Sequence, residues 1–380
     1  GITYVDVIIA GLIPATILSL TIFIAVHYVS APQLEDTDVD TLIQDPLPRD
    51  EFISEGIKFG LPLAVLIYKL GIEQVTVMTA ALWTAAVMLA TGLMIPVVRS
   101  AMGISDESAI ESLKRTGWET LDGAREGVIV LAPVTIILAA INGVVDILTA
   151  TGVPTAISLT LLDLSGGVLL VAAILSMIIC IILGLGMPTT ASYTIVALLV
   201  APTLISQFFL PELASHFFVF YAAILAGLTP PIATCVAVAC GIAGGNFWGT
   251  CVEAIKISAP LFVLPFVFVY HPEIVSAQLD QLTLTSAGFA LIGAIAIIHG
   301  INYRFSYDRA ATGGLRVAFF IVGVLAMVYP GRLVQAGAMV AAILMYVFQS
   351  VTGRPNPVET VTSLFSAETE SVATANAEQK

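Results

Sequence analysis

The sequence predicts an all-α polytopic membrane protein, and three observations lead to that fold class. Of the 380 residues, 58% are hydrophobic and only 11% are charged, and the mean hydropathy is +1.00. A soluble globular domain carries about 25% charged residues, so this composition excludes an ordinary soluble enzyme. The third observation is a series of about ten long apolar runs, since one helical pass through a bilayer needs roughly 20 such residues.

The apolar runs follow one another along the chain, separated by polar segments. They cover residues 5–29, 56–70, 75–98, 127–150, 166–183, 193–210, 217–243 with a break, 255–270, 287–301, 316–329 and 333–351. An acidic loop at 30–55 follows the first run, and a connector with glycine and proline at 151–163 precedes the run that begins at residue 166. From residue 353 the chain is polar and poor in aromatic residues, which predicts a disordered tail at 353–380.

The segment 99–126 has a different pattern, because apolar residues recur there at helical spacing among charges. This pattern is typical of a helix that lies in the membrane interface. The segment also holds four basic residues, and Lys and Arg favour cytoplasmic loops, so we expect it on the cytoplasmic side. The same rule places segment 272–285, which has no Lys or Arg, on the outer side. The apolar residues at helical spacing are Ile110, Leu113, Trp118 and Leu121.

Charge and cysteine usage exclude several functional classes. Lys and Arg total 14 while Asp and Glu total 27, and the net charge of −13 is opposite to that of a nucleic-acid-binding surface. The four cysteines lack the paired spacing and neighbouring histidines of a zinc site, so we expect them to serve packing. No glycine run ends in Lys-Ser or Lys-Thr, which leaves no phosphate-binding loop for ATP hydrolysis. We therefore expect no catalytic residues and no cofactor apart from a coupling ion.

Two of the apolar runs are interrupted by glycine and proline, and these breaks are the strongest functional candidates. The first break is 184–190 (GLGMPTT) and the second is 227–231 (GLTPP). A proline lacks the amide that would bond to the carbonyl four residues earlier. Inside a membrane an opened backbone is tolerated only against protein or a polar cavity. The carbonyls predicted to lose their helical partners are those of Gly184, Ala226 and Gly227.

The oxygens at the two breaks suit a sodium ion, and the amide-rich start of the following half-helix suits a carboxylate. We therefore predict a sodium site made of backbone carbonyls, next to a site for an organic acid. The predicted sodium ligands are Gly184, Gly186, Met187, Ala226 and Gly227. The predicted substrate-binding residues are Thr189, Thr190, Ser192, Thr229 and Pro231.

A simpler interpretation of the breaks stays open, because proline and glycine often only bend a transmembrane helix. Under that interpretation the chain is a non-transporting scaffold subunit of a membrane complex. An intramembrane enzyme would need paired titratable groups at one depth, and Asp146 with Asp163 is a poor pair. The four histidines are scattered near the ends of the runs, so we expect interfacial roles for them rather than metal binding.

The two breaks resemble motifs of a known family. Residues 184–193 (GLGMPTTASY) resemble the signature of the large membrane subunit of TRAP transporters (tripartite ATP-independent periplasmic). Residues 218–233 (FVFYAAILAGLTPPIA) resemble the second signature of that family, and residues 259–272 are similar to the stretch that follows it. The likeness is in particular to the fused permeases that work with TAXI-type binding proteins, and it extends over residues 1–273.

This resemblance implies an elevator-type secondary transporter of two inverted repeats, each with a re-entrant hairpin and an unwound helix. It implies Na⁺-driven uptake of an organic acid across the cytoplasmic (inner) membrane, with the acid delivered by an extracytoplasmic TAXI-type binding protein. The first repeat, and a fused small membrane subunit, would precede residue 1. The chain would then be the C-terminal portion of the permease and would hold half of the site.

The resemblance also implies a division of the chain. Residues 1–126 would hold membrane spans and a cytoplasmic amphipathic arm that links the two repeats. Residues 127–271 would form the second transport repeat, with its hairpin at 166–210 and its broken helix at 217–250. Residues 272–352 would be additional C-terminal spans. The leading functional prediction is therefore a Na⁺-coupled carboxylate permease subunit, and the alternative is the scaffold subunit.

Overall fold

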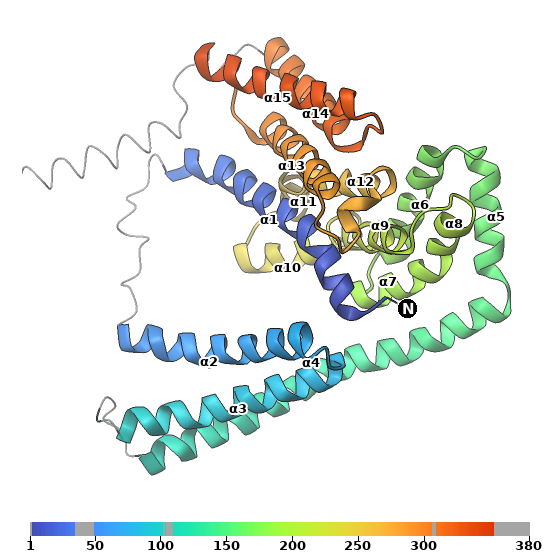
Figure 1. Cartoon of the computed structure of the whole chain (residues 1–380). Coiled ribbons are helices and arrows are strands. Elements are labelled where there is room, and N and C mark those ends of the chain that lie inside the picture. The colour runs from blue at the N-terminus through green and yellow to red at the C-terminus, as the bar shows by residue number, and fades with distance from the viewer. Residues whose placement is uncertain (1, 35–48, 102, 104–108, 306–308, 353–380) are drawn as a thin grey trace, which may run out of the picture. The chain divides into compact units, whose positions relative to one another are not determined.

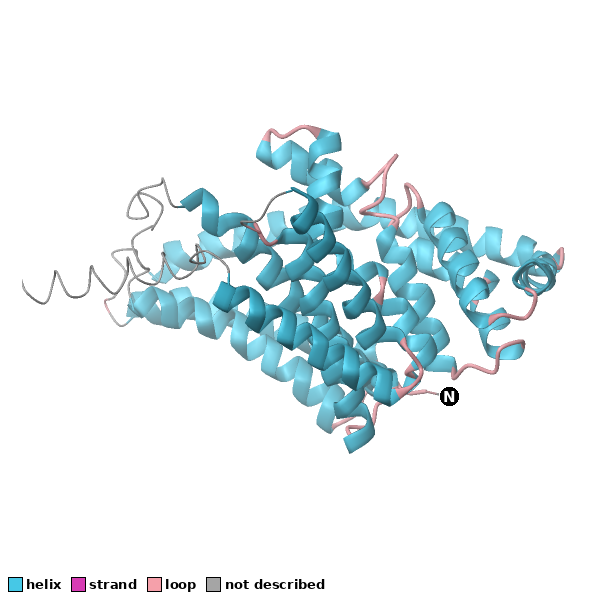
Figure 2. Ribbon diagram, turned by 90° about the horizontal axis from the view of Figure 1, so that it is seen from above, coloured by secondary structure: helices cyan, strands magenta, loops and turns pink. Residues whose placement is uncertain are grey.

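The computed structural model describes residues 2–34, 49–101, 103, 109–305 and 309–352. Throughout these ranges the chain forms fifteen α-helices and no strand (Figures 1 and 2). Six helices are long and apolar enough to cross a membrane, or up to eight if each of two bent helix pairs is one span. The predicted all-α polytopic membrane fold is thereby confirmed. The predicted tail at 353–380 and most of the acidic loop lie outside the described residues.

The chain forms two compact units. The first comprises Gly1–Ile8 and Asp40–Ala140, and the second comprises Ile9–Val39 and Ile141–Lys380. In the first unit, α2 (Arg49–Ile67) packs against α3 (Val77–Ala101), and a π-helical turn connects them (Tyr68–Ile72). At that turn the Lys69 ammonium lies 2.6 Å from a Glu73 carboxylate oxygen and 4.9 Å from the centre of the Trp83 ring.

The long helix α4 (Ala109–Ala150) differs from the prediction, because it joins the expected interfacial helix and the expected span 127–150 without a break. Its 42 residues extend over about 63 Å, twice the ~30 Å thickness of a hydrocarbon core, so only part of it can lie within a bilayer. The glycines in its polar half cost about 1 kcal/mol each in a helix, which is too little to end it. An i,i+4 ion pair between Arg115 and Glu119 (3.5 Å) supports the same half.

The second unit contains both predicted breaks. Most of α1 (Tyr4–Leu34) and the end of α4 belong to it. The helices that follow are α5 (Val153–Ser165), α6 (Leu169–Gly184), α7 (Thr189–Leu199), α8 (Ala201–Ser206), α9 (Glu212–Leu225), α10 (Thr234–Ala243), α11 (Phe247–Ile257), α12 (Leu264–Tyr270), α13 (Gln281–Asn302), α14 (Arg309–Val328) and α15 (Arg332–Thr352).

Two segments of this unit differ from the sequence prediction, and proline explains both. The expected connector at 151–163 forms most of α5, where Pro154 occupies the first turn and needs no helical partner for its missing amide. The expected span 255–270 is interrupted by a 3₁₀ turn (Ala259–Phe262) before the short helix α12. Pro260 and Pro265 lie in the first turns of those two elements, and neither can donate the helical hydrogen bond that a continuous span would need there.

Helix α9 lies at the centre of the packing in the second unit. One side chain cluster joins α9 to α1, α12 and α13, with the Tyr221 and Phe268 rings in an edge-to-face contact at 5.1 Å. A second cluster joins the other side of α9, including Phe218, to α6, α7 and α8. The aromatic segment in the middle of α9 (residues 217–221) therefore serves mainly packing. Because α9 ends at the second break, this packing determines where that break lies.

Helices α13 and α14 cross at glycines, which lets their backbones approach closely. A Cβ on Gly293 would lie 2.6 Å from the Gly323 carbonyl oxygen, and a Cβ on Gly323 would lie 2.6 Å from the Gly293 carbonyl oxygen. About two turns further along α13, a Cβ on Gly300 would lie 2.7 Å from Phe319 Cβ. Helices α13 and α14 consequently pack closely, and α15 packs on them (Figure 1).

Candidate functional site

The first break is a tight turn between α6 and α7. Helix α6 ends at Gly184, the backbone of Leu185 is extended, and Gly186 has a φ of +76°, which favours glycine. Pro188 then precedes the first residue of α7. The Met187 amide donates to the Gly184 carbonyl (3.3 Å), so the prediction that this carbonyl is free was wrong. The turn replaces the helical hydrogen bond that Pro188 cannot donate.

The second break separates α9 from α10 by an irregular segment with a cis peptide bond between Pro230 and Pro231. The Gly227 carbonyl accepts a hydrogen bond from the Cys235 amide (3.1 Å), so the prediction of a free carbonyl was wrong here as well. The Ala226 carbonyl differs, because Pro230 has no amide to donate to it. The Thr229 hydroxyl donates back to the Leu225 carbonyl (2.5 Å).

Ala233, the residue before α10, holds a left-handed conformation with a φ of +41°, although it is fully buried. A non-glycine residue in this region is strained, and such strain is concentrated at functional sites. The break therefore ends in a backbone conformation that the surrounding packing has to impose.

The two breaks lie against each other. A Cβ on Gly184 would lie 2.6 Å from Ser192 Oγ and 2.7 Å from Ala226 Cβ, so the hairpin tip contacts the end of α9 directly. A Cβ on Gly186 would lie 3.3 Å from Ile232 Cδ1, which belongs to the second break. Only glycine at position 184 permits this approach. The structure therefore brings together residues that the sequence separates by more than 30 positions.

Ser192 is the most informative residue at this junction. It is 1% exposed, and its hydroxyl oxygen has no hydrogen-bond partner among the described residues. A buried hydroxyl without a partner costs about 1–3 kcal/mol, so such a group calls for an explanation. An ion or water bound beside Gly184 and Ala226 would supply the missing partner.

The other predicted site residues surround the junction. Met187 and Thr229 are half-buried, whereas Gly186, Thr189, Thr190 and Pro231 are exposed. The predicted set therefore divides into a buried junction (Gly184, Ser192, Ala226) and a more accessible rim. A ligand that approaches the junction would meet the rim residues first.

No charged side chain stands near either break in the sequence. Segments 164–211 and 213–252 contain no Asp, Glu, Lys or Arg. Within the described ranges, no group of three or more His, Cys, Asp or Glu side chains could hold a metal ion. A cation here would depend on neutral oxygens, and an anion on the amide-rich N-termini of α7 and α10.

Sequence reasoning missed two polar contacts that position the hairpin. The Tyr193 hydroxyl lies 2.9 Å from His216 Nδ1, which joins α7 to α9, although His216 had been expected to be interfacial. The Ser158 and Thr203 hydroxyls, both buried, lie 2.6 Å apart and join α5 to α8. Neither pair has a local sequence signal, because each joins residues far apart in the chain.

A third missed residue, Ser176 on α6, is fully buried, and its hydroxyl has no partner in the described part of the chain. It does have a sequence signal. Ser176, Cys180 and Gly184 recur at i, i+4 spacing in an otherwise aliphatic helix, which marks the face of α6 that packs closely.

Comparison with known proteins identifies one family. The family model described as "Tripartite ATP-independent periplasmic transporter, DctM component" matches residues 1–279. No curated protein and no solved structure matches the chain significantly. The matched residues include both breaks and end just before α13.

Proposed function

The chain belongs to the DctM family of TRAP transporters, and we propose that it performs Na⁺-coupled uptake of an organic acid at the junction of its two breaks. As a DctM component it is a multi-pass permease of the inner membrane and part of a tripartite system with a binding protein and a small membrane subunit. In our proposal the binding protein is of the TAXI type, and the small subunit is fused upstream of residue 1.

The observation that carries this proposal is the contact between the hairpin tip and the end of α9. Paired discontinuous helices are the usual sites of substrate and ion binding in secondary transporters. Here Gly184, Ser192 and Ala226 meet without any charged side chain, and the Ser192 hydroxyl is buried without a partner. Neutral oxygens in a dehydrated setting favour a monovalent cation such as sodium over a more strongly hydrated divalent ion.

The proposed sodium ligands follow from this geometry. We propose Ser192, which was predicted from the sequence as a substrate-binding residue, as a sodium ligand instead. Its Oγ and the Ala226 carbonyl have no hydrogen-bond partner among the described residues, and Gly186 and Met187 lie on the hairpin side. The carbonyls of Gly184 and Gly227 accept one hydrogen bond each, but a carbonyl oxygen has two lone pairs and can also contact an ion.

The substrate carboxylate would bind on the rim, next to the sodium. Thr189 and Thr190 begin α7, whose first amides and positive dipole end favour an anion. Thr229 and Pro231 would line the opposite side. A bound sodium ion would add positive charge, so acid and ion would each strengthen the binding of the other, which is what coupled transport requires.

The proposal also assigns the segments of the chain that move during transport. Residues 127–271 would be the second transport repeat of an elevator-type carrier, with its hairpin at 166–210 and its broken helix at 217–250. Tyr193 with His216 and Ser158 with Thr203 would hold the closed hairpin in place. Opening of the hairpin would break these contacts and expose the site.

Uptake of labelled organic acids by the full-length permease in proteoliposomes, with its loaded binding protein outside, tests this proposal. We expect uptake to depend steeply on external Na⁺ and to be independent of ATP. Uptake that persists when choline replaces Na⁺ would contradict the ion assignment. A stable complex that moves none of the acids under any gradient would favour the scaffold alternative.

A further inference from the structure

Helix α15, which lies beyond the family-matched residues, carries two buried glutamines. Gln335 is 1% exposed and Gln349 is 6% exposed, and they lie about four turns apart, or ~21 Å along the helix. A buried amide in a membrane-spanning helix is costly unless it is hydrogen-bonded. Each of these glutamines contacts a buried histidine from another part of the second unit.

The first pair joins α15 to the segment that follows α12. The Gln335 amide nitrogen lies 3.1 Å from the Ala326 carbonyl and 3.0 Å from His271 Nε2. His271 Nε2 also lies 3.1 Å from the carbonyl oxygen of Tyr329, which follows α14, and the other ring nitrogen, Nδ1, faces Glu273. That nitrogen lies 3.4 Å from a Glu273 carboxylate oxygen, which also accepts a hydrogen bond from the Ser286 hydroxyl on α13 (2.5 Å).

The second pair joins the other end of α15 to α13 and α1. Gln349 Oε1 lies 2.5 Å from His299 Nε2, and because an amide oxygen only accepts, this imidazole carries its proton on Nε2. Its Nδ1 then accepts from the Tyr28 hydroxyl on α1 (3.0 Å). The ring stacks on Tyr303 at 4.6 Å and contacts Tyr346 edge-on at 5.1 Å.

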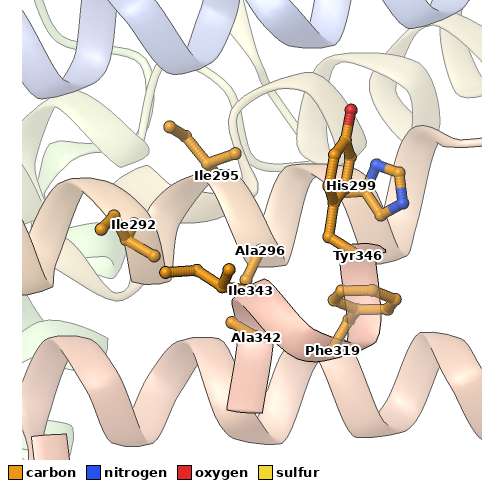
Figure 3. Close-up of a pocket in the computed structure, with 8 residues that line it drawn as sticks. All are labelled: Ile292, Ile295, Ala296, His299, Phe319, Ala342, Ile343 and Tyr346. Atoms are coloured by element: carbon orange, nitrogen blue, oxygen red, sulfur yellow. The ribbon is translucent and has the colours of Figure 1, made fainter. Parts of the chain in front are cut away.

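Apolar packing between α13 and α15 is incomplete beside this second pair. A pocket of about 230 Å³, open on one side, is lined by Ile292 and Ile295 of α13 and Ile343 of α15, with His299 and Tyr346 together at one end (Figure 3). Because α13 and α15 do not close against each other at this pocket, the His299–Gln349 contact beside it supplies a larger share of the local attachment of α15.

Helices α13 and α14 also share the core of the proposed transport repeat. Ile297 of α13 and Met327 of α14 belong to one buried cluster with Leu225 of α9 and Phe268 of α12. Leu225 immediately precedes Ala226 at the second break. The C-terminal helices are therefore packed on the helix that forms half of the candidate site.

We infer that α13–α15 form one rigid body with α1, α9 and α12, held by the His271–Gln335 and His299–Gln349 pairs, and move with the substrate site during transport. The movement itself rests on the proposed function, whereas the rigid attachment does not. The residues 272–352, which were expected only as additional spans, would then belong to the moving part of the carrier.

Distances between label pairs in the full-length protein, reconstituted in nanodiscs, test this inference. One pair joins exposed Glu212 at the start of α9 to Leu333 at the start of α15, and a reference pair joins Glu212 to Ile72 between α2 and α3. We expect a narrow Glu212–Leu333 distribution that does not shift with Na⁺ or with substrate, while the Glu212–Ile72 distance changes. A Glu212–Leu333 distance that shifts together with the reference pair would overturn the inference.

The reference pair makes it possible to distinguish a failure of this inference from a failure of the proposed function. If the Glu212–Ile72 distance stays constant under all conditions, the elevator part of the proposed function fails, while a narrow Glu212–Leu333 distribution still supports the rigid attachment. The double substitution of Gln335→Leu and Gln349→Leu should cause loss of the narrow distribution, and Leu344→Ala, at an exposed position on α15, should leave it unchanged. An unchanged distribution in the double variant would show that the glutamines do not hold α15.

Discussion

Replacing Gly184 by alanine should weaken sodium binding, because it separates the two breaks. The added Cβ would lie 2.6 Å from Ser192 Oγ and 2.7 Å from Ala226 Cβ. Carbon atoms in contact are about 3.5–4.0 Å apart, so α6 and the end of α9 would have to separate by roughly 1 Å. Ser192 Oγ can turn away by rotation of its side chain, but Ala226 Cβ is fixed to its backbone, so the backbone of α6 or of the end of α9 has to give way.

The size of the effect follows from the cost of overpacking. An added carbon in a well-packed core costs about 1–3 kcal/mol, which reduces the population of the closed junction by roughly 5- to 150-fold. Sodium affinity falls in proportion to the fraction of molecules that can bind the ion. We therefore expect the sodium concentration for half-maximal uptake to rise about 10-fold, with little change in the amount of folded protein.

Uptake at varied external sodium, measured in proteoliposomes with the binding protein, checks this prediction. Gly241→Ala on α10 is the matched control, because nothing lies within 4 Å of the added Cβ, and it should behave as the wild type. Combining Gly184→Ala with Ala226→Gly removes one of the two clashes and should recover part of the affinity. Equal sodium curves for Gly184→Ala and Gly241→Ala would refute the reasoning that the two breaks form one site.

Three further predictions concern the stability of the purified protein, measured by thermal unfolding in sodium and in choline. Ser192→Ala removes the cost of a buried unpartnered hydroxyl, about 1–3 kcal/mol, so the variant should be more stable than the wild type in choline and should gain less from added sodium. Ala233→Gly relieves a left-handed conformation that costs an alanine about 1–3 kcal/mol, so it should raise the unfolding temperature under both conditions. Gly293→Ala should lower that temperature, because its Cβ would lie 2.6 Å from the Gly323 carbonyl, whereas Gly288→Ala on the same helix has open space and should not.

The fold class and the positions of the breaks could be predicted because both are local properties of the chain. Hydropathy identifies membrane helices, and the combination of glycine and proline around Pro188 and Pro230 favours a break, whereas the single prolines Pro62 and Pro96 lie inside helices. Helix α4 was predicted less well, since glycines within an otherwise helical pattern do not show whether the helix bends or continues.

The hydrogen bonds inside the breaks could not be predicted from the position of proline alone. The rule that a proline frees the carbonyl four residues earlier fits Ala226, whose carbonyl accepts no hydrogen bond from the described residues. It fails for Gly184, whose carbonyl accepts from Met187 in the turn, and for Gly227, whose carbonyl accepts from Cys235 in the next helix. The carbonyl groups of an irregular segment can accept hydrogen bonds from several different donors. The sequence does not show which of these donors the folded structure brings close.

The contact between the two breaks also required the structure. Nothing local in the sequence indicates that Gly184 faces Ala226 or that Ser192 is buried between them. Glycine is required at position 184 only because the end of α9 passes close to it, and the sequence does not show that neighbour.

Equilibrium binding of radioactive sodium to the purified full-length protein tests the central claim most directly. We predict saturable binding that weakens in Ser192→Ala and Gly184→Ala and stays at the wild-type level in Gly241→Ala. Absence of saturable binding, or equal binding by all four proteins, would contradict a sodium site at the junction of the two breaks.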